Sequence, residues 1–370
     1  MLKRNNDLIN ARGVANNPPI SCDSPLINQD YASFINSLLP VQQGVPANRR
    51  RLPHNPSFEL HPYLKHVSEE YFEKYIIGTF PPISYVIDEL LDNNGLAITH
   101  MLQPENGIIA RPAIPFFHGN RGLMWDYILT PDELVALNNI LDREGKRDYL
   151  IDWLLKSKII YSDIIFSTQR ELENNRYTAK DTQLNNICIN KDLICHILTN
   201  SNARYLMFNS SSTFGQNNWV NNDYSKSFDL FVKGCRELGL KVELKISQGP
   251  TLPIPWIEVN LFNAAFINQN FKNKIAFEMR LSITGNIDKL LLGNCLGADK
   301  FISKEFHVFT PISPAGIRGA ALGNLIFQRW ALLHNDGLIN MGGLRNFLKD
   351  IFIWYKQNEI DQIYNLNIQL

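Results

Sequence analysis

The stretch that decides the fold is KYIIGTFPP, residues 74–82. A short apolar run ends abruptly at Gly78, and Pro81 and Pro82 then stop any regular strand from continuing. The next segment, SYVIDELLDN at 84–93, has helical periodicity. A buried strand, a tight turn and a helix in this order are typical of the first unit of an α/β fold, and ligand sites in such folds lie where the strands end.

Three further apolar runs also end in polar residues. The four strands predicted in this way end at Gly78, Thr168, Asn209 and Thr310. Helical patterns lie between them, for example at residues 130–141, 191–198 and 228–238. We therefore expect an α/β protein with three layers (α/β/α) and a central, mostly parallel four-stranded sheet.

Composition divides the chain into three parts. Residues 1–58 are rich in Asn, Pro, Gln and Ser and predict a loosely ordered extension. Residues 59–335 form the expected α/β domain, with insertions at about 83–115 and 215–300, and residues 336–370 add an amphipathic helix packed on it. The arginines at 49–51 leave two interpretations open, a solvated arm or an arm that contacts phosphates.

Bulk properties narrow the class of protein. Lys plus Arg and Asp plus Glu number 36 each, so any contact with nucleic acid must rest on a local basic patch. Five cysteines without a CxxC pair predict neither a disulfide framework nor a zinc site. No segment resembles a signal peptide or reaches the roughly 20 apolar residues of a membrane helix. We expect a cytoplasmic protein with no membrane contact.

Common catalytic motifs are missing from the strand ends. The turn GTFPP has no glycine-rich phosphate-binding pattern, and Phe80 and Pro81 would obstruct a phosphate. His61 and His66 lie near each other without the HExxH spacing, and the other histidines are scattered, so no metal ligand set can be assembled. The serines at 210–212 follow a strand but lack the GxSxG elbow.

The segment FFHGNRGLMWDYI, residues 116–128, combines four aromatic residues with Asn120 and Arg121. Aromatic side chains at this density usually form a core, because each ring buries a large area. A site for a flat ligand is the alternative. The sequence leaves both open.

Five segments, in this order, resemble the uracil-DNA glycosylase superfamily. They look most like its hypoxanthine and mismatch-type bacterial branches, in which a first strand ends in a G-x-x-P turn and a late strand ends in an S-P loop. The resemblance covers about residues 58–335. The segments are residues 61–82, 116–128, SDIIFSTQR at 162–170, RYLMFNSSSTF at 204–214 and TPISPAGIRG at 310–319.

The resemblance implies a monofunctional DNA glycosylase without metal or cofactor. Such an enzyme flips a nucleotide out of double-stranded DNA and hydrolyses its N-glycosidic bond, leaving an abasic site. The reaction passes through a cationic sugar, so it needs a polar group to place a water and donors for the departing base. An aromatic face receives the flipped ring.

The resemblance also assigns roles in the first two motifs. Gly78, Thr79 and Phe80 would lie beneath the sugar and base, with Phe80 where several branches carry a water-positioning Asn or Asp. In the hypoxanthine-type branch the catalytic Asn lies shortly before a Phe-Trp pair, and here that place holds glycine. We therefore expect Asn120, and after it His118, to supply the catalytic polar group.

Other residues follow from the same comparison. Phe117 and Trp125 would form a wall or stacking face, with a core role as the favoured alternative for Trp125, and Asn209 would read a base edge or else cap a turn. Asp163 and Asp181 are expected to be structural. The residues expected to contact DNA are Thr310, Ser313, Pro314, Arg318 and Arg121.

Two departures from the family bear on the substrate. The water-positioning Asn or Asp is missing from both usual places, and the insertions lengthen the chain at the sheet edge. We expect a bulky modified pyrimidine of phage DNA as the substrate, hence a role in antiphage defence. Repair of uracil or hypoxanthine is the alternative, and a catalytically inactive DNA-binding protein is the alternative of another class.

Overall fold

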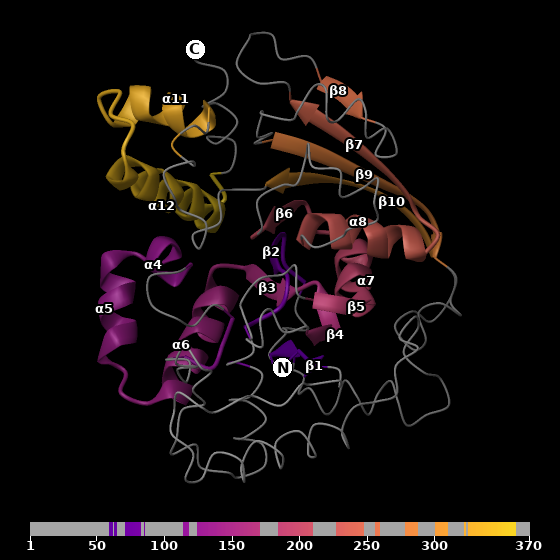
Figure 1. Ribbon diagram of the computed structural model, residues 1–370, viewed down its shortest axis with the longest axis horizontal. Helices are drawn as coiled ribbons and strands as arrows, with labels where there is room; N and C mark the ends of the chain where they lie inside the picture. The colour runs from indigo at the N-terminus through magenta and orange to yellow at the C-terminus, as the bar shows by residue number, and fades with distance from the viewer. Residues whose placement is uncertain are drawn as a thin grey trace, which may run out of the picture.

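Four parallel strands form one side of the main sheet (Figure 1). They are β3 (Ile159–Asp163), β2 (Lys74–Gly78), β6 (Tyr205–Phe208) and β10 (Lys300–Phe309), adjacent in that order. The computed structural model describes residues 59–61, 63–64, 71–82, 85, 114–117, 124–170, 184–209, 227–247, 256–259, 278–287, 300–309, 322 and 325–359. Within these residues the α/β character and the parallel centre of the sheet are as expected.

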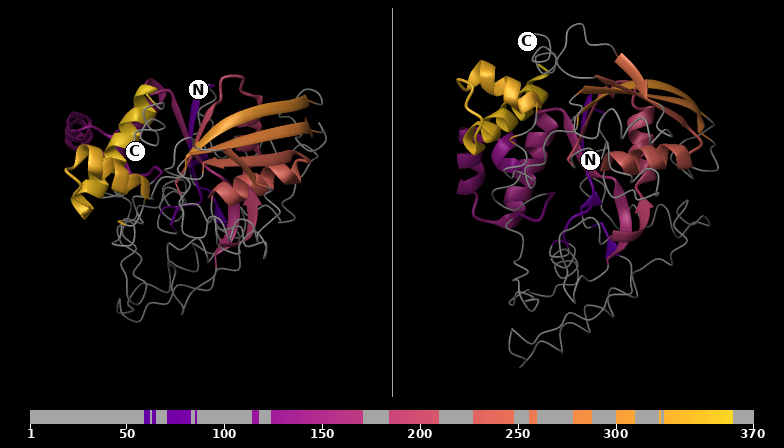
Figure 2. Two further views of the ribbon diagram at one scale, coloured as in Figure 1. Left: turned by 90° about the horizontal axis from the view of Figure 1, so that it is seen from above. Right: turned by 45° about the horizontal axis from the view of Figure 1, so that its top comes forward.

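The sheet is larger than the sequence predicted. Beyond β10 it continues through β9 (Glu278–Ile287), β7 (Lys241–Ser247) and β8 (Trp256–Val259), all antiparallel, to give seven strands. These strands lie within the insertion expected at about residues 215–300. Because β9 pairs along the whole length of β10, the insertion extends the main sheet, and Figure 2 shows these strands curving away from the two C-terminal helices.

A second, three-stranded sheet corrects one predicted strand. It contains β1 (Glu59–Leu60), β4 (Ile165–Arg170) and β5 (Leu184–Ile189), and Thr168 pairs there with Glu59. The strand ending at Thr168 is therefore not part of the parallel sheet, whose corresponding strand ends at Asp163. One continuous run of β-forming residues spans 159–168, and its break at Ile164 separates two strands of different sheets.

Helices cover both faces of the main sheet (Figure 1). On one face α7 (Lys191–Thr199) and α8 (Ser227–Glu237) lie together, and Phe208 of β6 packs on Phe228 and Phe231. On the other face Ile76, Tyr161 and Met207 join a large apolar cluster with the remaining helices. These are α4 (Trp125–Ile128), α5 (Pro131–Asn139), α6 (Arg143–Lys156), α11 (Leu325–His334) and α12 (Met341–Gln357).

Local signals in the sequence set several helix ends. Thr130 and Glu133 form a reciprocal capping box at α5, with Pro131 in the first turn, as the sequence predicts. Gly239, at a φ of 76°, terminates α8 in the left-handed conformation that glycine tolerates. The helical pattern expected over residues 130–141 is longer than the helix, because α5 ends at Asn139 and Leu141 is 96% exposed.

The C-terminal helix packs on the domain as expected. The predicted apolar stripe of α12 is buried, and Tyr355 in its last turn donates hydrogen bonds to the carbonyls of Tyr75 and Tyr205. Lys74 at the start of β2 donates to the carbonyls of Tyr355 (2.5 Å) and Lys356 (2.8 Å). These bonds join the end of α12 directly to the central strands.

The three cysteines in the described part of the chain are all buried. Cys195 and Cys235 are free, and burial raises the pKa of the Cys235 thiol. Cys188 takes part in a disulfide, which the cysteine spacing did not predict. No helix among the described residues is long and apolar enough to cross a membrane.

Candidate functional site

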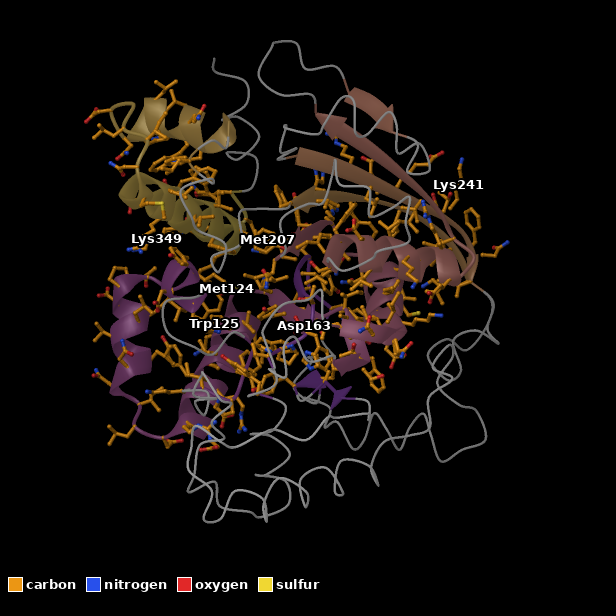
Figure 3. All side chains as sticks on the ribbon, in the orientation of Figure 1. Met124, Trp125, Asp163, Met207, Lys241 and Lys349 are labelled. Atoms are coloured by element: carbon orange, nitrogen blue, oxygen red, sulfur yellow. The ribbon has the colours of Figure 1, made fainter. Side chains whose placement is uncertain are left out.

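The candidate site lies at the carboxyl ends of the parallel strands. In the sheet, β2 lies between β3 and β6. The chain passes from β2 to β3 on one side and later to β6 on the other side of β2, so the order of strands reverses at β2. Ligands of open α/β sheets bind at such a switch point. Gly78, Asp163 and Asn209 stand at these strand ends, and Figure 3 shows Asp163 near the middle of the molecule.

Asp163 is held by a histidine from the smaller sheet. His61 follows β1, and its Nε2 lies 2.8 Å from Asp163 Oδ2. The backbone N–H of Tyr63 donates to His61 Nδ1 at 3.1 Å, so Nδ1 is an acceptor and the ring proton is on Nε2. His61 and Asp163 are 1% and 3% exposed. The histidine thus donates to one carboxylate oxygen in a dry environment.

The second carboxylate oxygen lies against a glycine. A β-carbon at Gly78 would come within 2.1 Å of Asp163 Oδ1, so any other residue here would displace this carboxylate. Among the described residues Oδ1 is buried and has no hydrogen-bond partner. The main chain of Asp163 is also fixed, because Asn190 Nδ2 donates to its carbonyl at 3.2 Å. A rigid frame therefore presents one free acceptor at the strand ends.

Asn209 provides a second free acceptor. Its backbone N–H donates to the Ile77 carbonyl (2.9 Å), and its Nδ2 donates to the Tyr161 hydroxyl (2.7 Å). Its Oδ1 is buried with no partner in the part of the chain that the structure describes. Burial, with a smaller contribution from the Asp163 charge, raises the pKa of Tyr161 well above its ordinary value, so the phenol stays protonated.

Aromatic rings surround these polar groups. The Phe117 ring lies 4.6 Å from that of Tyr161 and 5.3 Å from that of His61, and Phe80 meets His61 edge to face at 5.3 Å. Phe80 and Phe117 are both buried. The predicted residues Gly78, Phe80, Phe117 and Asn209 thus come together around His61 and Tyr161, and Thr79 lies half-buried between the first two.

Trp125 lies one layer behind this site. It is 3% exposed, its indole N–H donates to the Phe117 carbonyl at 2.7 Å, and its ring stacks on Phe116 at 6.1 Å. Of the two roles left open by the sequence, these contacts support the core role. Trp125 positions the main chain of Phe117 rather than presenting its own face.

Several predicted site residues cannot be placed. They lie outside the described residues and comprise His118, Asn120, Arg121, Thr310, Ser313, Pro314, Arg318 and Asp181. The predicted catalytic and DNA-contacting side chains are in this group. The arrangement above therefore rests on the strand ends and on the aromatic residues before position 118.

The sequence did not indicate that His61, Tyr161 and Asp163 meet at these strand ends. Asp163 was expected at the start of a strand in a structural role, whereas it ends β3 beside Gly78. The signal was available in the alternation of Tyr161 and Asp163, which puts both on one face of a strand ending at 163. His61 carried no such signal, because its partner is distant in the sequence.

The described residues hold no group of three or more His, Cys, Asp or Glu side chains that could bind a metal ion. Comparisons with protein-family models, curated proteins and solved structures gave no match.

Proposed function

We propose that the protein is a monofunctional DNA glycosylase, which flips a non-canonical base out of double-stranded DNA and hydrolyses its N-glycosidic bond. The observation that carries the proposal is the buried Oδ1 of Asn209 at the switch point, which has no hydrogen-bond partner among the described residues, while its Nδ2 donates to Tyr161 beside the Phe117 ring. A buried acceptor without a donor is costly in a folded protein, so its retention points to a ligand that supplies the donor.

The chemistry of a flipped base matches this site. Uracil, hypoxanthine and cytosine derivatives each carry an N–H donor on the edge that pairs in duplex DNA, and an amide oxygen can accept from it. Tyr161 fixes the other arm of the Asn209 amide, so the oxygen is pre-oriented. The aromatic rings offer the apolar surroundings that a flat ring requires.

A bulky modified pyrimidine of phage DNA is the favoured substrate, because the chain departs from the family at both water-positioning places. The described part of the 215–300 insertion does not add walls to the site. Its helix α8 packs on the opposite face of the sheet, and β7, β8 and β9 extend the sheet past β10. Repair of uracil or hypoxanthine is the alternative to test beside it.

A base-release assay tests the proposal. Duplexes containing uracil, hypoxanthine or glucosylated hydroxymethylcytosine are incubated with the protein, followed by alkali cleavage and mass spectrometry of released bases. We expect release from one of them, and a loss of roughly 10- to 100-fold in Asn209→Ala, the effect of losing one good base contact. Asn202→Ala is the matched control, because Asn202 is exposed near the opposite end of β6.

Two outcomes contradict the proposal in different ways. Binding of a duplex without release of any base would identify a DNA-binding protein that has lost catalysis. Release that is equally fast in Asn209→Ala, with the thermal midpoint unchanged, would remove Asn209 from base recognition.

A further inference from the structure

We infer that Asp163 is the catalytic residue that holds and deprotonates the attacking water, and that His61 is its positioning residue. The inference rests on the proposed glycosylase function and names the group that performs its central step. It is carried by the carboxylate of Asp163, which has one oxygen bound to His61 and the other, next to Gly78, without a donor in the part of the chain that the structure describes.

The position of Asp163 explains how the site can have Phe80 where several branches of the resembled family carry a water-positioning Asn or Asp. Phenylalanine cannot accept a proton, so a site with Phe80 needs its acceptor from another element. Gly78 pairs directly with Asp163 across the parallel strands β2 and β3. The neighbouring strand thus delivers a carboxylate to the same turn, over a residue whose missing side chain leaves room for it.

His61 decides which oxygen is free. Its Nδ1 accepts from the Tyr63 N–H, which leaves Nε2–H as the donor to Oδ2. The ring is also confined by Phe80 and Phe117 on neighbouring sides. A base oriented by a third group in this way is the arrangement that general-base catalysis requires.

A purely structural role accounts poorly for the free oxygen. Carboxylate oxygens in buried structural pairs are usually saturated with donors, because an unpaired one costs several times more than a neutral acceptor. Here Oδ1 is buried and without a donor among the described residues, while Oδ2 is well bound. A water molecule between Oδ1 and a bound nucleotide would satisfy it.

The reaction balances with these groups. The C1′–N bond breaks and its electron pair leaves with the base, so the sugar becomes cationic. The water oxygen forms a bond to C1′ and gives one proton to Asp163 Oδ1. That proton passes to solvent or to the departing base, which regenerates the carboxylate and yields a free base and an abasic site.

The test compares Asp163→Asn with the wild type on the duplex that the wild type cleaves best. Single-turnover base release should slow at least about 100-fold, within the range that a general base contributes. Affinity for a duplex carrying the uncleavable 2′-fluoro analogue of that nucleotide should change less than about 3-fold, because the amide is isosteric. Asp152→Asn, at an exposed pair with Lys156 on α6, should behave as wild type in both.

His61 is tested by rescue. His61→Ala should slow release about tenfold or more, and His61→Gln, whose side-chain amide can again donate to Oδ2, should recover most of the rate. Thermal unfolding of each variant separates slow catalysis from loss of folding. If Asp163→Asn does not fold, the comparison of His61→Ala with His61→Gln tests the assignment of Asp163.

The outcomes distinguish this inference from the proposed function. A wild type that releases no base from any duplex overturns both. A wild type that is active, with Asp163→Asn or His61→Ala within about 3-fold of it, overturns only the assignment of Asp163 and leaves the glycosylase in place.

Discussion

Gly78 serves the site through the space it leaves. Its φ lies outside the left-handed region, unlike those of Gly239, Gly285 and Gly337, so backbone freedom does not explain its presence. The reason is steric, since a β-carbon at this position would lie 2.1 Å from Asp163 Oδ1 and 3.4 Å from the Tyr161 hydroxyl. One missing side chain therefore allows two polar groups to approach the end of β2.

We expect Gly78→Ala to be harmful. The added methyl group would lie 2.1 Å from Asp163 Oδ1, so the carboxylate must turn away from its bond with His61. Overpacking of this kind costs about 1–3 kcal/mol of the free energy of unfolding. Denaturant unfolding should show this loss, and base release should fall with it.

Gly342→Ala is the opposite control. This glycine is exposed in the first turn of α12, and a β-carbon there meets only Asn340 Oδ1 at 3.4 Å. Alanine should be neutral or stabilise the protein by up to about 1 kcal/mol through its helix propensity. Equal behaviour of the two variants would show that the turn at Gly78 adjusts freely.

The sequence predicts this site only in part. A glycine and an asparagine after apolar runs were recognisable at Gly78 and Asn209, because strand ends are where polar groups gather in α/β sheets. The partner of Asp163 was not recognisable, since His61 reaches it from another sheet across 102 residues. Pairing between distant residues depends on the tertiary arrangement, which local patterns do not encode.

At the scale of elements, α12 is joined to the sheet through Lys74. The last carbonyls of a helix lack partners within the helix, and a cation at this end also interacts favourably with the helix dipole. Lys74 Nζ reaches two such carbonyls from the first residue of β2. Burial nevertheless lowers the pKa of Lys74 to about 8, because its charge is removed from water.

This shift predicts a pH dependence with a definite sign. The unfolded chain keeps the Lys74 proton up to a pKa of 10.5, whereas the folded chain releases it near pH 8. Between these values the unfolded state binds more protons, so rising pH stabilises the fold. We expect the free energy of unfolding of wild type, relative to Lys74→Met, to increase by about 1–2 kcal/mol from pH 8 to pH 10 after solvent screening.

Urea unfolding at a series of pH values measures this difference. Lys349→Met, an exposed lysine on the same helix, controls for the general effect of removing one positive charge. The difference in free energy of unfolding between wild type and Lys74→Met could instead stay constant with pH. That result would mean that the hydrogen bonds to the two carbonyls fully compensate the burial of the ammonium group.

Element boundaries show where sequence patterns stop being informative. The start of α5 at Thr130 and the glycine after α8 follow from local signals in the sequence. The division of residues 159–168 into β3 and β4 was not, because both halves have the composition of a buried strand. Which sheet each half joins is decided by pairing with Lys74–Gly78 and Glu59–Leu60.

At the scale of the whole molecule, the parallel and antiparallel halves of the sheet differ in their surroundings. Every residue of β2 is buried, because helices cover both faces there. β10, which joins the two halves, has several exposed residues, among them Phe301 at 66%, and β8 forms the edge of the antiparallel half with β7 as its one neighbour among the described strands. The proposed site lies at the ends of the fully covered strands.

This difference predicts a gradient of backbone opening. Amides of β2 and β6 should exchange only on global unfolding, whereas the edge strand can open locally at lower free energy. Hydrogen exchange followed by mass spectrometry should therefore show residues 74–78 and 205–208 exchanging on the order of 100-fold more slowly than 256–259. β3 lies at the other edge of the sheet, but all its residues are buried, so its protection should follow that of β2. Equal protection from β2 to β8 would instead mean that the seven strands open as one cooperative unit, with the antiparallel extension as integral to stability as the parallel centre.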